Sequence, residues 1–464
     1  MISVRRRGAA RLAAAVLASG LVAAGAIATA GTAAADDAPP SQGGATATLG
    51  GLKTFDKAII HDNGKDQQVG AGLFEMSVDN GGSIQTYCID LHNPTQSKAK
   101  YEEKSWAETS LANNPNAGKI NWVLQNSYPQ VNDLDALAKT AGTGPLTEKT
   151  AAAGTQVAIW RFSDNAKVDA ADPQAEKLAD YLEKSAQNLQ EPKASLSLDP
   201  PAVSGKAGER LGPVKVHTNA DSVTLAPGAE SAGGVKLVDK SGKTITSAAD
   251  GGEVYFDVPE GAADGSATLT AQAATKVPVG RAFASATKSQ TQILAGSSES
   301  TVSATATANW AKKGAVPAVS AEKDCAKGGV DITASNKGDE AFTFELLGQK
   351  YTVEAGQSKT VTAPVKEDQS YKFTISGPNG FEKTFSGVLD CKTSSSGGSS
   401  DTPSSQPSPA SAGGSTGGDT SGGDLAETGS SSNTPMIAGI AVALVVVGGG
   451  AIFFVRKKKA TAGE

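Results

Sequence analysis

The sequence predicts a multi-domain, mainly β protein. It would have an α+β first domain, two β-sandwich modules, a flexible linker and one C-terminal apolar helix. Three observations predict this class. A length of 464 residues suits two to four domains. Residues 193–391 alternate apolar and polar side chains between Gly-rich turns, whereas residues 104–190 carry helical spacing. Aromatic residues make up only 5% of the chain, so no single large core is implied.

Residues 1–35 are predicted to be a secretory signal peptide. Arg5-Arg6-Arg7 precede a run of small apolar residues, and Ala33-Ala34-Ala35 offer small side chains before a cleavage site. We expect cleavage before Asp36, which leaves residues 36–47 as a polar, flexible lead. Export also makes disulfide bonds permissible in the mature chain.

Residues 48–190 are predicted to form the α+β domain, beginning with its β part. Alternation over residues 71–78 predicts a strand, and Asp79-Asn80-Gly81-Gly82 predicts the hairpin turn that follows it. The returning strand is expected over residues 83–90, with Cys88 near its end.

The helical part of this domain follows. Ile120, Val123 and Leu124 stand at i, i+3 and i+4, which indicates one helix face. A second helix is expected from about Thr147 through Phe162. A third is expected over residues 173–190, and its predicted buried face consists of Ala175, Leu178, Ala179 and Leu182.

Two β-modules come next. Short Val- and Thr-rich strands between Gly-containing turns predict an immunoglobulin-like sandwich over residues 193–310. A second β-module is expected over residues 318–391, where Cys325 and Cys391 stand at the two ends and are predicted to form a disulfide. Closing a loop of this size is worth about 4 kcal/mol in the chain-entropy model.

The C-terminal region has the organisation of a surface anchor. Residues 392–424 are rich in Ser, Gly, Thr and Pro, which is typical of a flexible linker. Residues 436–455 are apolar or glycine, and a helix of about twenty residues spans about 30 Å, the thickness of a bilayer core. The basic tail, residues 456–464, favours a cytoplasmic position for that end.

A pentapeptide precedes the apolar span: Leu425, Ala426, Glu427, Thr428 and Gly429. Pentapeptide, span and basic tail together resemble the cell-wall sorting signal of Gram-positive bacteria, in its Leu-Ala-x-Thr-Gly form. In that family a sortase cuts between threonine and glycine and joins the threonine carbonyl to a peptidoglycan amine. The resemblance implies sortase and peptidoglycan as partners through Thr428, a cell-wall location, and only transient contact of residues 436–455 with the membrane. A plain single-pass anchor is the alternative.

Cys88 is left without an evident partner among the three cysteines. An odd cysteine in an exported protein is an intermolecular partner or a reactive thiol. A third possibility arises when a glutamine side chain is held beside the cysteine. The thiolate attacks the carboxamide carbon, ammonia leaves, and an internal thioester remains. Effective molarities of about 10⁵–10⁸ M can make this otherwise very slow attack spontaneous inside a fold.

Two motifs supply such a pair: Tyr87-Cys88-Ile89-Asp90 and Thr155-Gln156-Val157-Ala158-Ile159-Trp160. Together they resemble the paired motifs of the thioester domains of Gram-positive, actinomycete-type surface adhesins. The resemblance covers roughly residues 48–190 and implies a Cys88–Gln156 side-chain cross-link. It also implies covalent adhesion to a target surface that bears an amine or hydroxyl. The residues expected around the bond are Tyr87, Ile89, Asp90, Thr155, Ala158 and Trp160. Because Trp160 lies one helical turn after Gln156, we expect it to cover the bond and exclude water.

Three alternatives stay open. A cysteine hydrolase or transpeptidase would pair Cys88 with His92, with Asp90 and His61 as further candidates. A structural wall protein would use the bond only as a stabilising staple. A disulfide from Cys88 to another cysteine would remove the thioester altogether. A covalent adhesin reacts once per molecule, so no enzyme is predicted.

Composition bears on other function classes. A net charge of −6 without a basic stripe in the mature region argues against nucleic acid as a partner. His61, His92 and His217 have no metal-ligand spacing, and no glycine loop suited to phosphate occurs. We therefore expect no cofactor and no metal.

Overall fold

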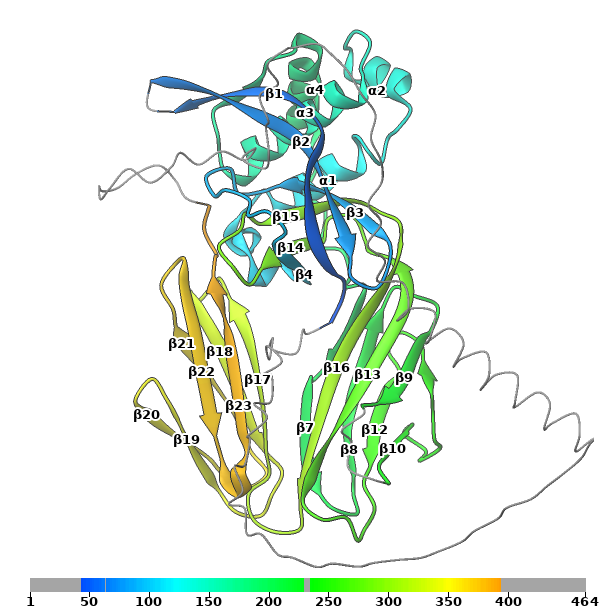
Figure 1. The fold of residues 1–464 in the computed structure, drawn as a ribbon, viewed down its shortest axis with the longest axis vertical. Helices are drawn as coiled ribbons and strands as arrows, with labels where there is room; N and C mark the ends of the chain where they lie inside the picture. The colour runs from blue at the N-terminus through cyan, green and yellow to red at the C-terminus, as the bar shows by residue number, and fades with distance from the viewer. Residues whose placement is uncertain (1–42, 63, 229–233, 394–464) are drawn as a thin grey trace, which may run out of the picture. The chain divides into compact units, whose positions relative to one another are not determined.

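The computed structural model describes residues 43–62, 64–228 and 234–393. The predicted signal peptide, the linker from residue 394, the pentapeptide and the apolar span 436–455 lie outside these residues. Within the described ranges, no helix is long and apolar enough to cross a membrane. The described chain is mainly β, as predicted, with four α-helices gathered in its first domain (Figure 1).

The first domain, which we call the head, is built on one sheet with the strand order β2-β3-β15-β14-β4-β1-β5. β1 also pairs with β2, so the order closes on itself and leaves β5 at the side. The strands are β1 (Thr46–Asp62), β2 (Lys65–Val78), β3 (Ser83–Cys88), β4 (Lys100–Lys104), β5 (Val168–Ala170), β14 (Ala282–Ser285) and β15 (Gln292–Ser297).

The long β1–β2 hairpin bends because its register shifts twice, between Leu49 and Gly51 and between Leu52 and Thr54. Gly72 faces the second shift. A Cβ on Gly72 would lie 2.2 Å from the Thr54 carbonyl oxygen, and its φ of +156° suits glycine. The bent strand β1 therefore pairs with two further strands: residues 46–48 pair with β4, and residues 58–60 pair with β5.

The helices of the head are α1 (Ala117–Gln125), α2 (Leu134–Ala141), α3 (Glu148–Ser163) and α4 (Pro173–Ser185), with two short 3-10 helices, η1 (Trp106–Glu108) and η2 (Ser110–Asn113), before them. All three predicted helices are present. The four positions predicted to be buried on the third helix are buried in α4. α3 packs against β1, β2, α1 and α4, so nearly every side chain from Ala151 to Trp160 is buried. Gly154 permits the contact with α4, since a Cβ there would lie 2.5 Å from the Ala175 carbonyl oxygen.

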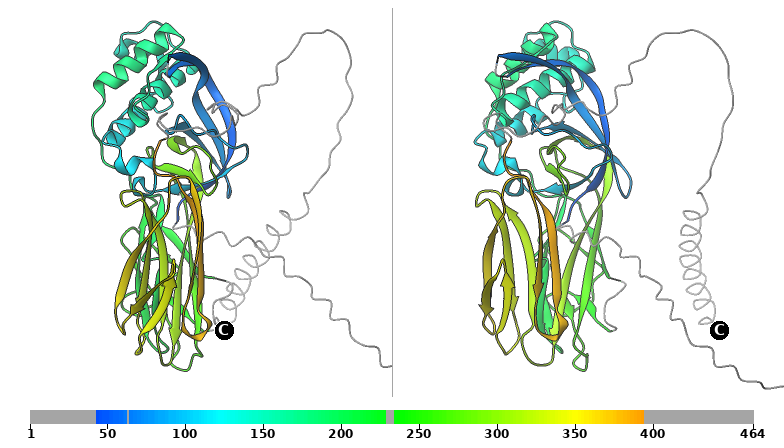
Figure 2. Two further views of the ribbon diagram at one scale, coloured as in Figure 1. Left: turned by 90° about the vertical axis from the view of Figure 1, so that its left-hand side faces the viewer. Right: turned by 60° about the vertical axis from the view of Figure 1, so that its left-hand side comes forward.

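The head is not continuous in sequence, and here the structure differs from the predicted division of the chain. β14 and β15 lie within residues 193–310, which were assigned to the first sandwich, yet β15 pairs with β3 and β14 with β4 (Figures 1 and 2). Gln292 stands opposite Cys88, and Ala282 opposite Lys104. Alternation and turns identify a strand but not its partner across such a sequence separation.

The remaining strands of that region form two sheets. One has the order β10-β12-β8-β6 and the other β11-β9-β13-β16-β7. Buried and partly exposed residues alternate along β13 and β16, as the sequence pattern predicted. The strands are β6 (Leu196–Asp199), β7 (Ala202–Lys206), β8 (Arg210–Thr218), β9 (Val223–Pro227), β10 (Lys236–Val238), β11 (Ser247–Ala248), β12 (Glu253–Asp257), β13 (Gly265–Lys276) and β16 (Glu299–Ala311).

The C-terminal module pairs its strands as β17-β18-β21, β19-β20 and β22-β23 around its own core. These strands agree with the β-rich pattern that predicted a module over residues 318–391. The predicted Cys325–Cys391 disulfide is also present. The elements are β17 (Pro317–Asp324), β18 (Gly329–Asn336), β19 (Phe342–Leu346), β20 (Gln349–Val353), β21 (Ser358–Pro364), β22 (Gln369–Ser376), η3 (Pro378–Gly380) and β23 (Glu382–Leu389).

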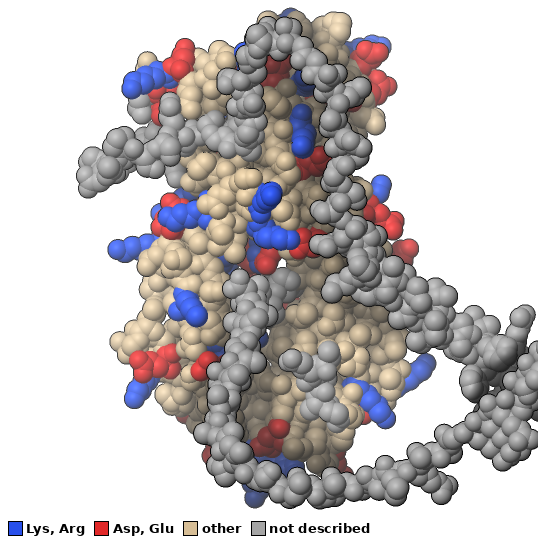
Figure 3. All heavy atoms as spheres, in the orientation of Figure 1, with Lys and Arg blue, Asp and Glu red and all other residues tan. Residues whose placement is uncertain are grey.

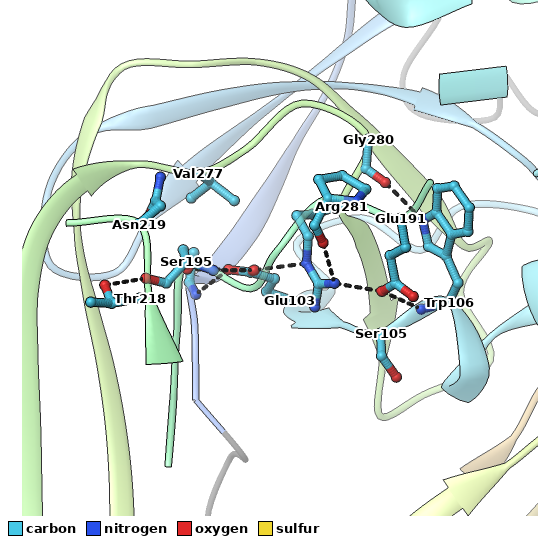
Figure 4. Close-up of polar contacts among 12 residues, drawn as sticks. Glu103, Ser105, Trp106, Glu191, Ser195, Thr218, Asn219, Val277, Gly280 and Arg281 are labelled. Atoms are coloured by element: carbon cyan, nitrogen blue, oxygen red, sulfur yellow. Dashed lines mark hydrogen bonds and ion pairs between the residues drawn. The ribbon is translucent and has the colours of Figure 1, made fainter. Parts of the chain in front are cut away.

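A buried ion-pair cluster, which we call the junction, ties the head to the first sandwich (Figure 4). Glu103 on β4 accepts hydrogen bonds from the Ser195 backbone N–H and from Arg281 Nε, both at 2.9 Å. Its other oxygen accepts from the Ala45 N–H at 3.2 Å and from the Ser195 hydroxyl. Arg281 also contacts Glu191 at 2.5 Å. One carboxylate thus fixes the start of β1, the approach to β6 and the approach to β14.

Charged side chains of both signs are scattered over the face shown in Figure 3, and the visible lysines and arginines are interspersed with acids. Several of the charges pair. Arg161, for example, contacts Asp169, Glu176, Asp180 and Glu183. The described part of this face therefore offers no concentrated basic patch.

Candidate functional site

Cys88 and Gln156 lie together in the head although they are 68 positions apart. Cys88 is the last residue of β3, and Gln156 lies in the middle of α3. The Cys88 N–H donates to Gln156 Oε1 at 3.0 Å, and Gln156 Nε2 donates to the Cys88 carbonyl oxygen at 2.9 Å. Both residues are fully buried. The carboxamide is thereby held against the backbone of the residue that carries the thiol.

The thiol sulfur has two hydrogen-bond donors close to it. Trp160 Nε1–H points at Cys88 Sγ from 3.2 Å, and the Asp90 N–H lies at 3.5 Å. Trp160 is only 1% exposed, and its indole N–H lies against the sulfur. Burial raises the pKa of the Cys88 thiol well above its usual value, and the nearby Asp164 charge raises it further. The sulfur therefore carries its proton at neutral pH and must give it up before it can attack.

One stripe of α3 supplies these contacts. Gln156, Trp160 and Asp164 stand at i, i+4 and i+8, so they follow one helix face. Gln156 contacts the Cys88 backbone, Trp160 contacts the Cys88 sulfur, and Asp164 Oδ1 accepts the N–H of Leu91 at 2.9 Å. Asp164 is the C-cap of the helix. It was missed from the sequence, although continuing the four-residue spacing past Trp160 would have found it.

The other predicted neighbours of the bond brace this arrangement without contacting the sulfur. The Tyr87 hydroxyl donates to the Tyr128 carbonyl oxygen at 2.8 Å, and the Ile89 N–H donates to the Thr291 carbonyl oxygen at 3.1 Å. The Thr155 and Ser127 hydroxyls share a hydrogen bond of 2.6 Å. Ala158 is fully buried on α3. These contacts hold β3 and α3 in place.

Asp90 is 1% exposed, and only one of its two oxygens is satisfied within the described chain. Asp90 Oδ2 accepts from the Asn93 side chain, whereas Oδ1 is buried and has no hydrogen-bond partner there. Burial raises the pKa of the Asp90 carboxyl well above its usual value, and the Asp390 charge raises it further. The uncharged form of this carboxyl is therefore favoured more strongly than that of a surface carboxyl.

Sequence reasoning missed the contribution of the segment that leads into β15. Gln292 stands opposite Cys88 and accepts a hydrogen bond from the Thr86 hydroxyl at 3.0 Å. Gln290 Nε2 donates to the Asp90 carbonyl oxygen at 2.6 Å. Both glutamines are fully buried. They lie about two hundred positions beyond the first motif, and no local signal links them to it.

The histidines considered for a cysteine–histidine pair have other contacts. His61 lies 2.7 Å from Asp66 and 3.1 Å from Asp169, and these carboxylates raise its pKa. His92 is half-buried near Asp164. Among the described residues, neither ring is a hydrogen-bond partner of Cys88 Sγ. The geometry favours Gln156 over a histidine as the partner of the thiol.

Three acidic side chains of the C-terminal module lie close enough together to bind one cation. Oxygens of Glu367, Asp368 and Asp390 in the C-terminal module lie within 4.8 Å of one another. All three residues are only partly buried, and acidic groups of this kind are common without a bound ion. The group does not include Cys88 or Gln156.

The family model for the thioester domain matches residues 85–188, a range that contains Cys88, Gln156, Trp160 and Asp164. This part of the chain is similar to the thioester-domain family. A second family model, for the C-terminal domain of bacterial phospholipase C, matches residues 317–388 of the C-terminal module. No curated protein matches the chain.

Among solved structures, the chain is similar to the Bacillus anthracis TIE protein. The match has 14% identity and a TM-score of 0.27 and covers 75% of this chain and 81% of that one. The thioester domain of the Enterococcus faecium TIE86 protein matches with 16% identity and a TM-score of 0.26, over 58% of this chain and 97% of that one. The YadV chaperone matches with 6% identity and a TM-score of 0.18, over 42% of this chain and all of that one. All three TM-scores are low, so these structures add nothing to the family match of residues 85–188 and the contacts of Cys88 and Gln156.

Proposed function

We propose that this protein is a surface adhesin whose head forms an internal Cys88–Gln156 thioester and then reacts covalently with a nucleophile on a target surface. The observation that carries the proposal is the paired contact between the Gln156 carboxamide and the Cys88 backbone, beneath Trp160 and out of solvent. The match of residues 85–188 to the thioester-domain family supports it.

Bond formation begins when Cys88 Sγ loses its proton and attacks the Gln156 carboxamide carbon. Negative charge then develops on Oε1, which already accepts the Cys88 N–H at 3.0 Å. A preoriented donor in a buried site stabilises this charge far more than it would in water. The carbon–nitrogen bond breaks, and the nitrogen leaves as ammonia with the proton from sulfur. An S–C bond replaces the amide.

In the second step, an amine or hydroxyl of the target attacks the same acyl carbon. The carbon–sulfur bond breaks, Cys88 regains a proton, and Gln156 becomes joined to the target through an amide or an ester. The cross-link is consumed by the reaction, so each molecule reacts once. Hence this function is not enzymatic turnover.

The rest of the chain would present this head at a distance from the cell. In this proposal the signal peptide directs export, and sortase joins Thr428 to peptidoglycan after recognising residues 425–429. The two β-modules and the linker of residues 392–424 form the stalk. Strands β14 and β15 leave the first stalk module and pair with strands of the head.

Intact mass spectrometry of the chain without its signal peptide tests the proposal. We expect a mass short by one ammonia, and addition of one methylamine when methylamine is supplied. The Cys88→Ala variant should show the full calculated mass and no adduct. A wild-type chain of full mass with an alkylatable Cys88 would sink the proposal.

The two alternative functions give other outcomes in the same assay. A cysteine hydrolase would show repeated turnover that is lost in His92→Ala. A bond that serves only as a staple would give the loss of ammonia but no methylamine adduct, with lower stability in Gln156→Ala.

A further inference from the structure

We propose that a pocket at the Asp164 end of α3 admits a primary amine of the target, and that the Asp164 carboxylate takes up the proton of this amine before it attacks Gln156. The inference rests on the proposed thioester. It adds the class of nucleophile, its path and its proton acceptor.

The stripe on α3 gives the path. Successive members of the stripe lie four residues apart, about 6 Å along the helix axis. Gln156 holds the acyl carbon, Trp160 covers the sulfur, and Asp164 stands at the end of the helix. The Asp164 N–H donates to the Trp160 carbonyl oxygen at 3.0 Å. Asp164 therefore lies one helical turn beyond Trp160 on the same face of α3.

A pocket of about 600 Å³ opens at this end of the stripe. Leu91, Asp164 and Ala166 line one side of it, and His61 and Asp66 of the β1–β2 hairpin line another. Leu91 is also the residue whose N–H binds Asp164, and it lies three positions after Cys88. Asp164, the stripe residue that carries a carboxylate, therefore lines the pocket together with Leu91, which follows Cys88 closely in the chain.

The surroundings of Asp164 suit proton uptake. Burial raises the pKa of its carboxyl to about 6, while the Ser163 hydroxyl and the Leu91 N–H stabilise the charged form. At neutral pH the group is thus mostly ionised, yet it is more basic than a carboxylate on the surface. An alkylammonium gains from a buried negative charge, whereas a neutral hydroxyl does not. This difference favours an amine.

The protons of this step pass between the amine, Asp164, Cys88 and solvent. The ammonium gives one proton to Asp164, and the resulting neutral amine attacks the acyl carbon and displaces Cys88 sulfur. The sulfur takes a proton back from Asp164, and the second proton lost by nitrogen goes to solvent. One amide and one thiol are formed, and one proton is released.

Other titratable or charged groups surround Asp164. Its neighbours are Cys88 and Asp90 on the β3 side, His92 on the following loop, His61, Asp62, Lys65 and Asp66 on the hairpin, and Lys167 beyond the helix. A change in rate near pH 6 must therefore be assigned to Asp164 by substitution.

The test measures methylamine uptake by the wild-type chain, by Asp164→Asn and by the matched control Asp66→Asn, between pH 5 and 8. Asn keeps an acceptor for the Leu91 N–H, and Asp66 lines the same pocket but is not on the stripe. The wild-type rate constant, expressed per total methylamine, should rise up to about pH 6 and then level off, because the reaction needs the ionised carboxylate and the ammonium form that predominates at these pH values. Asp164→Asn should react at least about tenfold more slowly at pH 7.5, and its rate constant should keep rising with pH, as expected for attack by free amine alone. Asp66→Asn should stay within about twofold of the wild type.

Two outcomes overturn the inference. In one, Asp164→Asn forms the thioester and matches the wild type in rate and pH profile. In the other, Asp164→Asn fails to lose ammonia and the wild-type rate constant per total methylamine keeps rising over the whole pH range without levelling off. A wild-type chain that never loses ammonia would instead sink the proposed function itself, so the two failures are distinguishable.

Discussion

The head contains two buried polar clusters, the junction and the Cys88–Gln156 site, which differ in charge and in how completely their hydrogen bonds are paired. At the junction, Glu103 and Arg281 carry full charges with side chains only 1% and 7% exposed, and both Glu103 oxygens accept hydrogen bonds. At the Cys88–Gln156 site the groups are neutral or kept from ionising, and Asp90 Oδ1 has no partner within the described residues. Charges that are fully paired hold elements in place, whereas a nucleophile and a carboxamide held together in a dry site are placed to react.

The two clusters differ in whether they contain groups that are available for a new covalent bond. The junction joins three backbone segments through one carboxylate, and nothing in it is left to form a new bond (Figure 4). The Cys88–Gln156 site holds a carboxamide against the backbone of Cys88, whose thiol burial keeps protonated. Removing a group should therefore cost mostly stability at the junction and mostly chemistry at the site.

The largest loss of stability is expected for Glu103→Ala. The change leaves Arg281 buried without its main partner and orphans the Ala45 and Ser195 N–H groups. Breaking a buried pair from one side costs about 3–5 kcal/mol. Chemical denaturation should show this loss in the free energy of unfolding. Glu103→Gln, which keeps the volume, should fall between this variant and the wild type, and a loss below about 1 kcal/mol in Glu103→Ala would contradict the role of the junction.

Gln156→Ala should have a free energy of unfolding about 2–4 kcal/mol lower than that of Cys88→Ala, which keeps the Gln156 carboxamide. The variant leaves the Cys88 N–H and carbonyl unpaired in a buried site, at about 1–3 kcal/mol for each unsatisfied group. Cys88→Ala is the matched comparison, because it removes the thiol but keeps both backbone contacts. It should cost less in stability, while both variants abolish methylamine uptake. Equal losses of stability would show that the thiol, and not the carboxamide contact, holds this site.

Asp390→Asn should stabilise the protein at pH 7.5 by about 1–3 kcal/mol. Burial raises the pKa of the Asp390 carboxyl to about 6, and its Oδ1 has no partner among the described residues. A raised carboxyl pKa means that the folded state binds the proton more tightly than the unfolded chain. The stabilisation is thus complete below about pH 4 and lost as the pH rises through 6. Melting temperatures at pH 5 and 7.5 should differ between wild type and variant chiefly at pH 7.5, and a constant difference would exclude this cause.

The smallest effect is expected for Lys100→Gln on the surface. Lys100 pairs with Asp79 at 2.5 Å, with the two side chains 61% and 37% exposed. Exposed pairs of this kind contribute about 0–1 kcal/mol because solvent screens them. A shift of the unfolding midpoint within the error of the measurement is the expected result. A loss as large as that of Glu103→Ala would remove the contrast between the junction and an ordinary surface pair.

Several elements could be predicted from local patterns. The Asp79–Gly82 turn joins β2 and β3, Thr147 caps α3, and the Cys325–Cys391 disulfide clamps the C-terminal module. Each of these signals is contained within a few residues or follows from the spacing of one residue type. The pairing of Cys88 with Gln156 was predicted only because two motifs resemble a family, and the structure places the Gln156 side chain against the backbone of Cys88.

The sequence alone predicted the mainly β class of the chain, the type of most elements and the Cys88–Gln156 pair. Periodicity, capping residues and turn chemistry act over short distances and are written in consecutive positions. Only the tertiary structure decided that β14 and β15 return to the head and that Glu103 meets Arg281 across 178 positions. It also decided that Asp164, on the same face of α3 as Gln156 and Trp160, lines a pocket. The physical reason is that burial, electrostatic shifts and strand pairing depend on which distant segments exclude water together, and no local pattern records that choice.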